Sequence, residues 1–289
     1  MGTFFKILLS FSIALTSIGA ADIATPVPKA RVGAWEINYD VDSCNLLAEF
    51  GDGPQSTFVR LTRYQPGDRF DLTVYGEAYE FPRSIVPVRV GFGLKEPIKR
   101  DAMTGHAGNK LPLLIVNSLR LDGWASETTD AESPPVTPDM EDRASILDLT
   151  IPGGKRFKLE TGSFGKPMQA MRACVDDLIK SWGYDPVQQA TLSAKPQPRT
   201  KPGSWLTNAD YPSGAALAAQ SGIVQFRLDI DETGKVASCR VLHRTNPDSF
   251  SALTCKRISQ RAKFRPARDK NGKPVRSYYV DKARFVIPD

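Results

Sequence analysis

Residues 222–242, with the sequence GIVQFRLDIDETGKVASCRVL, decide the fold of the last third of the chain. From Val224 to Ile230 apolar and polar residues alternate, which is the pattern of a strand with one buried face. The turn that follows contains Gly234, a residue type that tolerates the positive φ of tight turns, and a second apolar run starts at Val236. The stretch therefore predicts an antiparallel β-hairpin.

A helix and a closing strand are predicted after the hairpin. The helix starts near Pro247, with Asn246 or Asp248 placed to cap it, and carries apolar residues at helical spacing. Residues 278–287 then alternate again, which predicts a strand with one apolar and one charged face. Residues 204–289 are therefore expected to form a small α+β domain.

The order of these elements resembles the C-terminal domain of TonB-family proteins. The resemblance covers about residues 204–289 and rests on Tyr211-Pro212, the hairpin, the segment Phe264-Arg-Pro-Ala267 and the closing strand. It implies that the last strand lies at the sheet edge and receives an extended segment of an outer-membrane transporter, the TonB box. Strand addition of this kind uses the unpaired backbone groups of the edge, and flanking side chains give specificity. The residues that the resemblance assigns to partner binding are Tyr211, Pro212, Tyr278, Tyr279, Val280, Lys282, Ala283 and Arg284.

The resemblance also implies a role in energy-coupled transport, with inner-membrane motor proteins as further partners. TonB-like transducers usually carry a membrane helix and a long Pro-rich spacer, whereas residues 186–203 of this chain form only a short proline-containing linker. This departure keeps a second function open. The alternative is an unanchored periplasmic scaffold, or a protein that binds the cell envelope, without energy transduction.

The first 21 residues have the layout of a secretory signal peptide. Lys6 supplies the positive charge, residues 7–18 are apolar, and small residues lead to a cleavage site after Ala20 or Ala21. The apolar stretch is shorter than the ~20 residues of a membrane-spanning helix. This favours a periplasmic protein over the alternative of a retained inner-membrane anchor, and an exported protein is not expected to meet nucleic acid.

The four cysteines are expected to form two disulfides, because an even number of cysteines in an exported protein is typical of a disulfide framework. Four cysteines allow three pairings. The domain boundaries favour Cys44 with Cys174 and Cys239 with Cys255, so that each bond stays within one domain.

Residues 30–185 are predicted to form a β-rich domain that closes with a helix at residues 166–182. Short strands separated by Gly, Pro and Asp turns suggest a sandwich or a half-open barrel. Residues 124–142 are dense in Ser, Thr, Pro and acids, which is typical of a mobile surface loop. The predicted strands are Trp35–Tyr39, Phe58–Tyr64, Phe70–Gly76, Val86–Phe92, Leu113–Leu121, Ser145–Ile151 and Arg156–Thr161.

Charge and histidine content favour binding over catalysis. Residues 204–289 hold 15 Lys and Arg against 8 Asp and Glu, a basic excess that suits an anionic envelope polymer as a partner. The two histidines, His106 and His243, have no Ser, Cys or carboxylate near them in a catalytic order, and the cysteine spacing does not fit a zinc site. We therefore expect no enzyme activity, no cofactor and no metal.

Overall fold

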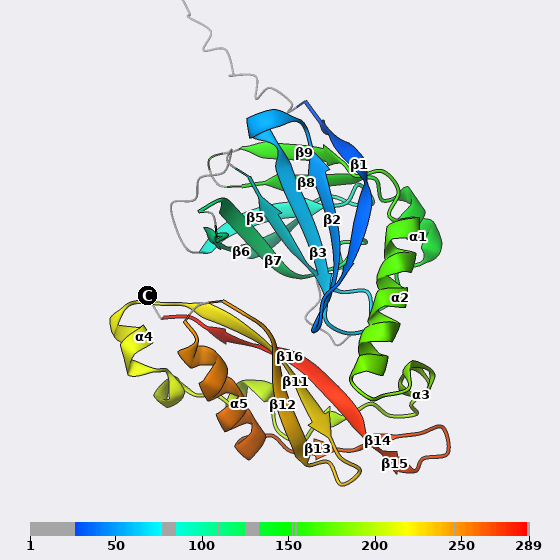
Figure 1. Cartoon of the computed structure of the whole chain (residues 1–289), viewed down its shortest axis with the longest axis vertical. Coiled ribbons are helices and arrows are strands. Elements are labelled where there is room, and N and C mark those ends of the chain that lie inside the picture. The colour runs from blue at the N-terminus through cyan, green and yellow to red at the C-terminus, as the bar shows by residue number, and fades with distance from the viewer. Residues whose placement is uncertain are drawn as a thin grey trace, which may run out of the picture.

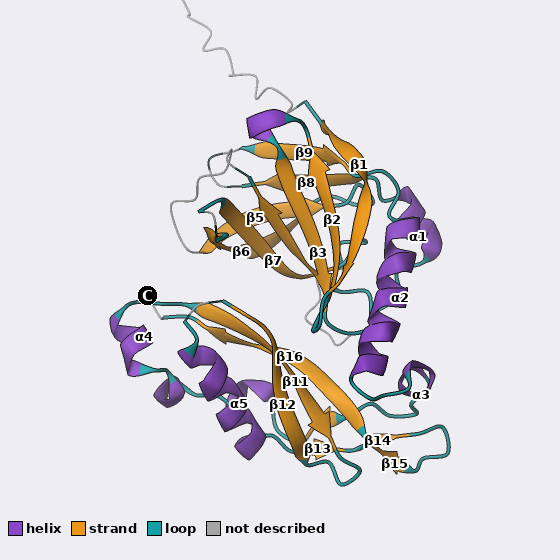
Figure 2. Ribbon diagram, viewed as in Figure 1, coloured by secondary structure: helices purple, strands orange, loops and turns teal. Residues whose placement is uncertain are grey.

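The computed structural model describes residues 27–76, 85–108, 110–124, 133–151, 153, 155–245 and 247–287. The predicted signal peptide lies outside these residues. The chain forms a closed nine-strand barrel followed by a smaller domain with a three-stranded sheet (Figure 1). Strands predominate and helices are few (Figure 2), so the predicted mix of a β-rich part and an α+β part agrees with the structure at this level.

The barrel strands are neighbours in the order β1-β2-β3-β4-β7-β6-β5-β8-β9. The first and last strands pair in parallel through Lys29 with Leu159 and Ala30 with Glu160, and this pairing closes the sheet. The sequence predicts a sandwich or half-open barrel, because no local pattern shows that the two ends meet. The strands are β1 (Lys29–Tyr39), β2 (Cys44–Phe50), β3 (Thr57–Arg63), β4 (Phe70–Tyr75), β5 (Ile85–Gly91), β6 (Ile98–His106), β7 (Pro112–Leu119), β8 (Ile146–Thr150) and β9 (Arg156–Glu160).

The barrel core is completed by helix α2 (Gly165–Ser181), which runs beside β1 and β2 (Figure 1). Met168 and Met171 of this helix are fully buried with the inward-facing residues of the barrel. The Cys44–Cys174 disulfide joins β2 to α2 across 130 positions of sequence. The structure thus contains the helix and this disulfide where the sequence predicts them.

Three elements of the barrel domain differ from the expectation. Strands β2 and β6 are not predicted, because neither has a clean alternation of apolar and polar residues. Within the expected loop 124–142, residues 138–143 form helix α1 (Pro138–Arg143), which Thr137 caps by accepting a hydrogen bond from the Met140 amide. Residues 125–132 of that loop lie outside the described part. His106 is the last residue of β6.

The proline-spaced residues 186–203 lie against the C-terminal domain. They contain α3 (Pro186–Ala190) and the short strand β10 (Gln197–Pro198), and they end within the 3-10 turn η2 (Pro202–Ser204). β10 pairs with β13 (Phe264–Arg265), and Ala194 bridges Arg268. Backbone pairing therefore fixes this segment at two points.

The C-terminal sheet has the order β12-β11-β16, with α5 packed on one face. Val224, Phe226, Leu228 and Ile230 of β11 are buried under α5, as their alternation predicts. The prediction of a single buried face is wrong, because Gln225 and Arg227 on the barrel side are also buried. The Cys239–Cys255 disulfide joins β12 to α5, as predicted. Asp248 precedes α5 but makes no capping hydrogen bond. The elements are η3 (Asn208–Asp210), α4 (Ser213–Leu217), β11 (Gly222–Ile230), β12 (Val236–Arg244), α5 (Ser249–Arg261), β14 (Ala267–Arg268), β15 (Pro274–Val275) and β16 (Ser277–Phe285).

Candidate functional site

The candidate site is the outer edge of β16. This strand pairs with β11 across nine consecutive residues without a register shift, from Ser277 opposite Ile230 to Phe285 opposite Gly222. Among the described residues, no other strand pairs with β16. The edge is therefore long and regular, which is the geometry that an added strand requires.

The direction of each backbone group in β16 follows from the hydrogen bonds of β11. The Thr245 amide donates to the carbonyl of Ile223, so Ile223 directs its backbone groups toward β12. Because these directions alternate along a strand, Val224 turns toward β16 and bonds its opposite residue Ala283. The outward backbone groups of β16 are then those of Tyr278, Val280, Lys282 and Arg284.

The predicted partner-binding residues of β16 divide into two groups. Tyr279 and Ala283 turn their backbone groups toward β11 and their side chains toward the core under α5. The other four, whose backbone faces outward, place their side chains on the opposite face, toward the barrel. They are Tyr278, Val280, Lys282 and Arg284.

The barrel side of β16 is occupied by contacts between the two domains. Lys282 pairs with Asp71 of β4, with 3.2 Å between Nζ and Oδ1. Tyr278 packs edge-on against Trp182, with ring centroids 5.1 Å apart. Tyr184 donates a hydrogen bond to Asp229 and lies 3.0 Å from the Ser277 carbonyl. Lys282 is therefore already neutralised, and Arg284 is the exposed cation of this face.

The predicted residues Tyr211 and Pro212 lie beside one end of the sheet. The Tyr211 ring contacts Phe285 at 5.8 Å between centroids, so this segment borders the C-terminal end of β16. The Tyr211-Pro212 segment is held in place by the preceding residue, Asp210, which is 5% exposed and accepts hydrogen bonds from Arg261 of α5. The Arg261 guanidinium and the Thr207 amide hold the pKa of Asp210 well below its usual range.

Asp281 was not predicted, although it lies in the middle of the edge strand. Its Oδ1 accepts a hydrogen bond from the Lys282 amide at 2.8 Å, and its Oδ2 accepts one from the Tyr279 hydroxyl at 2.8 Å. Burial and the neighbouring Asp281 carboxylate raise the pKa of Tyr279, so its phenol remains a donor. The signal in the sequence that could have identified it is an acidic residue at a core-facing position of the strand.

The opposite edge of the sheet, β12, is less regular. Its pairing with β11 has register shifts between Gln225 and Phe226 and between Asp229 and Ile230. Such bulges twist an edge and hinder the addition of a further strand. Of the two edges, β16 is the better template.

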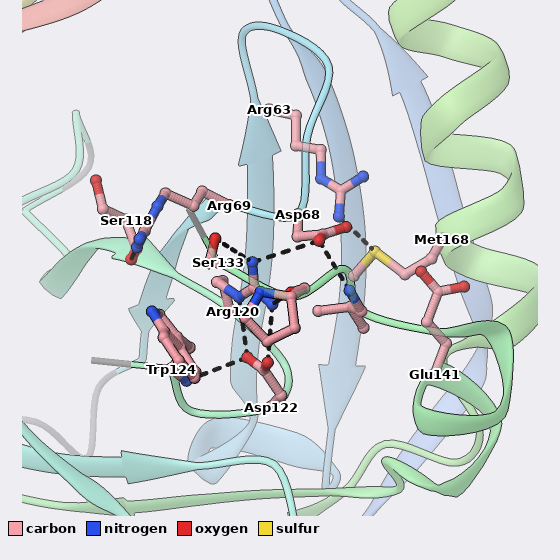
Figure 3. Close-up of polar contacts among 12 residues, drawn as sticks. Arg63, Asp68, Arg69, Ser118, Arg120, Asp122, Trp124, Ser133, Glu141 and Met168 are labelled. Atoms are coloured by element: carbon pink, nitrogen blue, oxygen red, sulfur yellow. Dashed lines mark hydrogen bonds and ion pairs between the residues drawn. The ribbon is translucent and has the colours of Figure 1, made fainter. Parts of the chain in front are cut away.

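The barrel contains a buried polar cluster around Arg120 (Figure 3). Arg120 is 1% exposed and binds Asp122 through two nitrogen atoms, while Ser133 accepts a third hydrogen bond and Asp68 lies at 3.4 Å. The carbonyl of Pro134 accepts another bond. The guanidinium is surrounded by acceptors that hold the 133–136 segment on the barrel, so we interpret the cluster as structural.

Among the described residues, no group of three or more His, Cys, Asp or Glu could hold a metal ion. Across the same residues, no helix is long and apolar enough to cross a membrane. His243 lies on β12, with its ring centroid 6.3 Å from that of Tyr64.

Comparison with known proteins agrees with the geometry of the small domain. Residues 207–287 match the family model of the Gram-negative bacterial TonB protein C-terminal domain. Searches of curated proteins and of solved structures found no match. The matched range includes the hairpin, α5 and β16 and excludes the barrel. Residues 207–287 are therefore a TonB-family C-terminal domain.

Proposed function

We propose that the protein binds an extended segment of an outer-membrane TonB-dependent transporter as an additional strand on β16. The family match supports this class of partner, because TonB C-terminal domains interact with such transporters. The observation that carries the binding mode is the regular, unpaired edge of β16. Backbone hydrogen bonds to Tyr278, Val280, Lys282 and Arg284 supply affinity that depends little on the partner's sequence.

The side chains around the edge supply specificity in this proposal. Arg284 is exposed and suits a carboxylate on the partner, whereas Lys282 is held by Asp71 and contributes less than the sequence suggests. Tyr211 and Pro212 form the boundary at one end of the added strand. In this proposal the protein works in the periplasm, and residues 1–21 serve as its export signal. A contribution to energy-coupled transport further requires a connection to inner-membrane motor proteins.

The binding mode is tested by proline substitution at the two edges of the sheet. The N-terminal segment of a TonB-dependent transporter, carrying a fluorescent label, is titrated with the full chain. Val280→Pro removes an outward amide of β16, and we expect affinity to fall at least about tenfold because a backbone bond and strand geometry are lost. Val241→Pro, on the bulged edge formed by β12, is the matched control.

Two results bear on the proposal directly. Weaker binding by Val280→Pro with unchanged binding by Val241→Pro supports addition to β16. Equal binding by wild type and Val280→Pro, with circular dichroism showing that both are folded, contradicts it. Ala283 is unsuitable for this test, because its amide bonds β11 and a proline there would break the sheet.

An unanchored scaffold that binds the cell envelope is the second candidate. It is favoured by the basic excess of the C-terminal part, where Lys256, Lys263 and Lys270 are exposed. Docking of the barrel on the sheet also suits a compact scaffold. Association with an anionic envelope polymer should weaken strongly in 0.5 M salt, because salt screens exposed charges. If the affinity for the polymer is the same with and without 0.5 M salt, this candidate is contradicted.

A further inference from the structure

The Asp281 side chain accepts a hydrogen bond from the Lys282 amide, a backbone donor that an added strand would need. The Lys282 amide points outward from the edge, yet it donates to Oδ1 of Asp281 at 2.8 Å rather than standing open. The carboxylate is fixed from its other oxygen by the Tyr279 hydroxyl, also at 2.8 Å. In the free protein, the middle of the edge is thus covered by a side chain of the same strand.

The charge of Asp281 has no cationic partner among the described residues. Its nearest chain neighbour with a positive charge, Lys282, lies on the opposite face of the strand and pairs with Asp71 of the barrel. The Tyr279 hydroxyl, which donates a hydrogen bond to Asp281, carries no charge. The site therefore combines a covered amide with an uncompensated carboxylate at an edge that otherwise accepts a strand.

An incoming strand changes both interactions. Its carbonyl oxygen takes the Lys282 amide, so the Asp281 carboxylate must turn away and lie beside a side chain of the new strand. Opposite charges that face each other across neighbouring strands stabilise a sheet, and like charges destabilise it. A Lys or Arg side chain on the partner, opposite Asp281, restores the interaction that the carboxylate loses.

We propose that Asp281 covers the β16 edge in the free protein and selects an added strand that carries a Lys or Arg opposite it. This inference rests on the proposed function and adds the chemistry of the partner. In this proposal Asp281, on the face of β16 that packs under α5, discriminates the charge of the partner. Lys282 instead joins the two domains through its ion pair with Asp71.

Two substitutions test the covering of the edge and the selection of charge separately. Asp281→Asn removes the charge but keeps an oxygen that accepts from the Lys282 amide. Asp281→Ala removes both. Glu232→Gln, in the exposed turn of the hairpin, changes net charge equally and is the control.

The probes are three synthetic peptides of alternating Thr and Val, with Lys, Glu or Thr at the central position. We expect wild type to bind the Lys peptide about fivefold more tightly than the Glu peptide, as an exposed cross-strand ion pair allows. Asp281→Asn should lose this preference. Asp281→Ala should also bind the Thr peptide more tightly, because its edge is uncovered.

Hydrogen exchange in the absence of peptide gives an independent readout. The Lys282 amide should exchange several-fold faster in Asp281→Ala than in wild type and nearly as slowly in Asp281→Asn. If Asp281→Asn keeps the preference for the Lys peptide, Asp281 does not select the partner's charge. If the Lys282 amide exchanges equally fast in Asp281→Ala and wild type, Asp281 does not cover the edge. If no peptide binds wild type or either variant, the proposed function fails and the selection fails with it, whereas the exchange result still decides the covering.

Discussion

The Cys239–Cys255 disulfide offers the most quantitative test of how the C-terminal domain is held together. It closes a loop with a sequence separation of 16 between the edge strand β12 and helix α5. The chain-entropy relation gives a loop of this length about 3 kcal/mol of stabilisation. For a domain of this size, that corresponds to a fall in Tm of roughly 12–24 °C.

The perturbation is the double substitution Cys239→Ala with Cys255→Ala, and the assay is urea unfolding with intrinsic fluorescence. Trp205 is 1% exposed in the core of the C-terminal domain, so its emission reports on that domain. Ser259→Ala, on the exposed side of α5, is the control and should leave the midpoint in place. A loss below about 1 kcal/mol in the double variant would refute the reasoning, because the bond would then constrain the unfolded chain very little.

Two further predictions concern the small domain. Asp210→Asn should remove an acid-dependent part of stability: the pKa of Asp210 is lowered in the folded state by Arg261, so its contribution is complete above about pH 5 and is lost as pH falls below the unfolded value near 3.9. Urea unfolding between pH 2.5 and 7 checks this, and an equal pH dependence in wild type and variant would argue against it. Gly234→Ala should cost roughly 2–4 kcal/mol, because φ is +84° and the new Cβ would lie 2.2 Å from the Phe264 carbonyl oxygen. Gly272→Ala shares the positive φ but has open space around it, so equal losses in thermal unfolding would refute the role of the close approach.

The small domain could be predicted because its pattern is local. Alternation from Val224 to Ile230 and the turn at Gly234 define the hairpin within about twenty residues. The two disulfides followed from counting cysteines within each domain. These features need no knowledge of distant contacts.

The closed barrel and its docking on the sheet could not be predicted in the same way. Closure depends on the pairing of Lys29 and Ala30 with residues about 130 positions later in the chain. The Asp71–Lys282 ion pair joins residues 211 positions apart, and no local pattern marks either of them as a partner of the other. Lys282 was therefore assigned to partner binding, and the structure shows it engaged with the barrel.

The predicted partner-binding residues also do not distinguish backbone groups that point away from β11 from those that bond it. Periodicity shows which side chains share a face of β16, but not which backbone groups point away from β11. That direction depends on hydrogen bonds to the neighbouring strand, such as the one from the Thr245 amide to the Ile223 carbonyl. For the same reason Asp281, whose carboxylate folds back onto the edge, was overlooked.

The most direct test of strand addition at β16 is amide hydrogen exchange of the full chain with and without the N-terminal segment of a TonB-dependent transporter. We predict new protection at the outward amides of Tyr278, Val280 and Arg284, with little change at Tyr279 and Ala283, which already bond β11, or at Lys282, whose amide is already bonded to Asp281. Protection that appears on β12 or on the barrel, with β16 unchanged, would contradict the account.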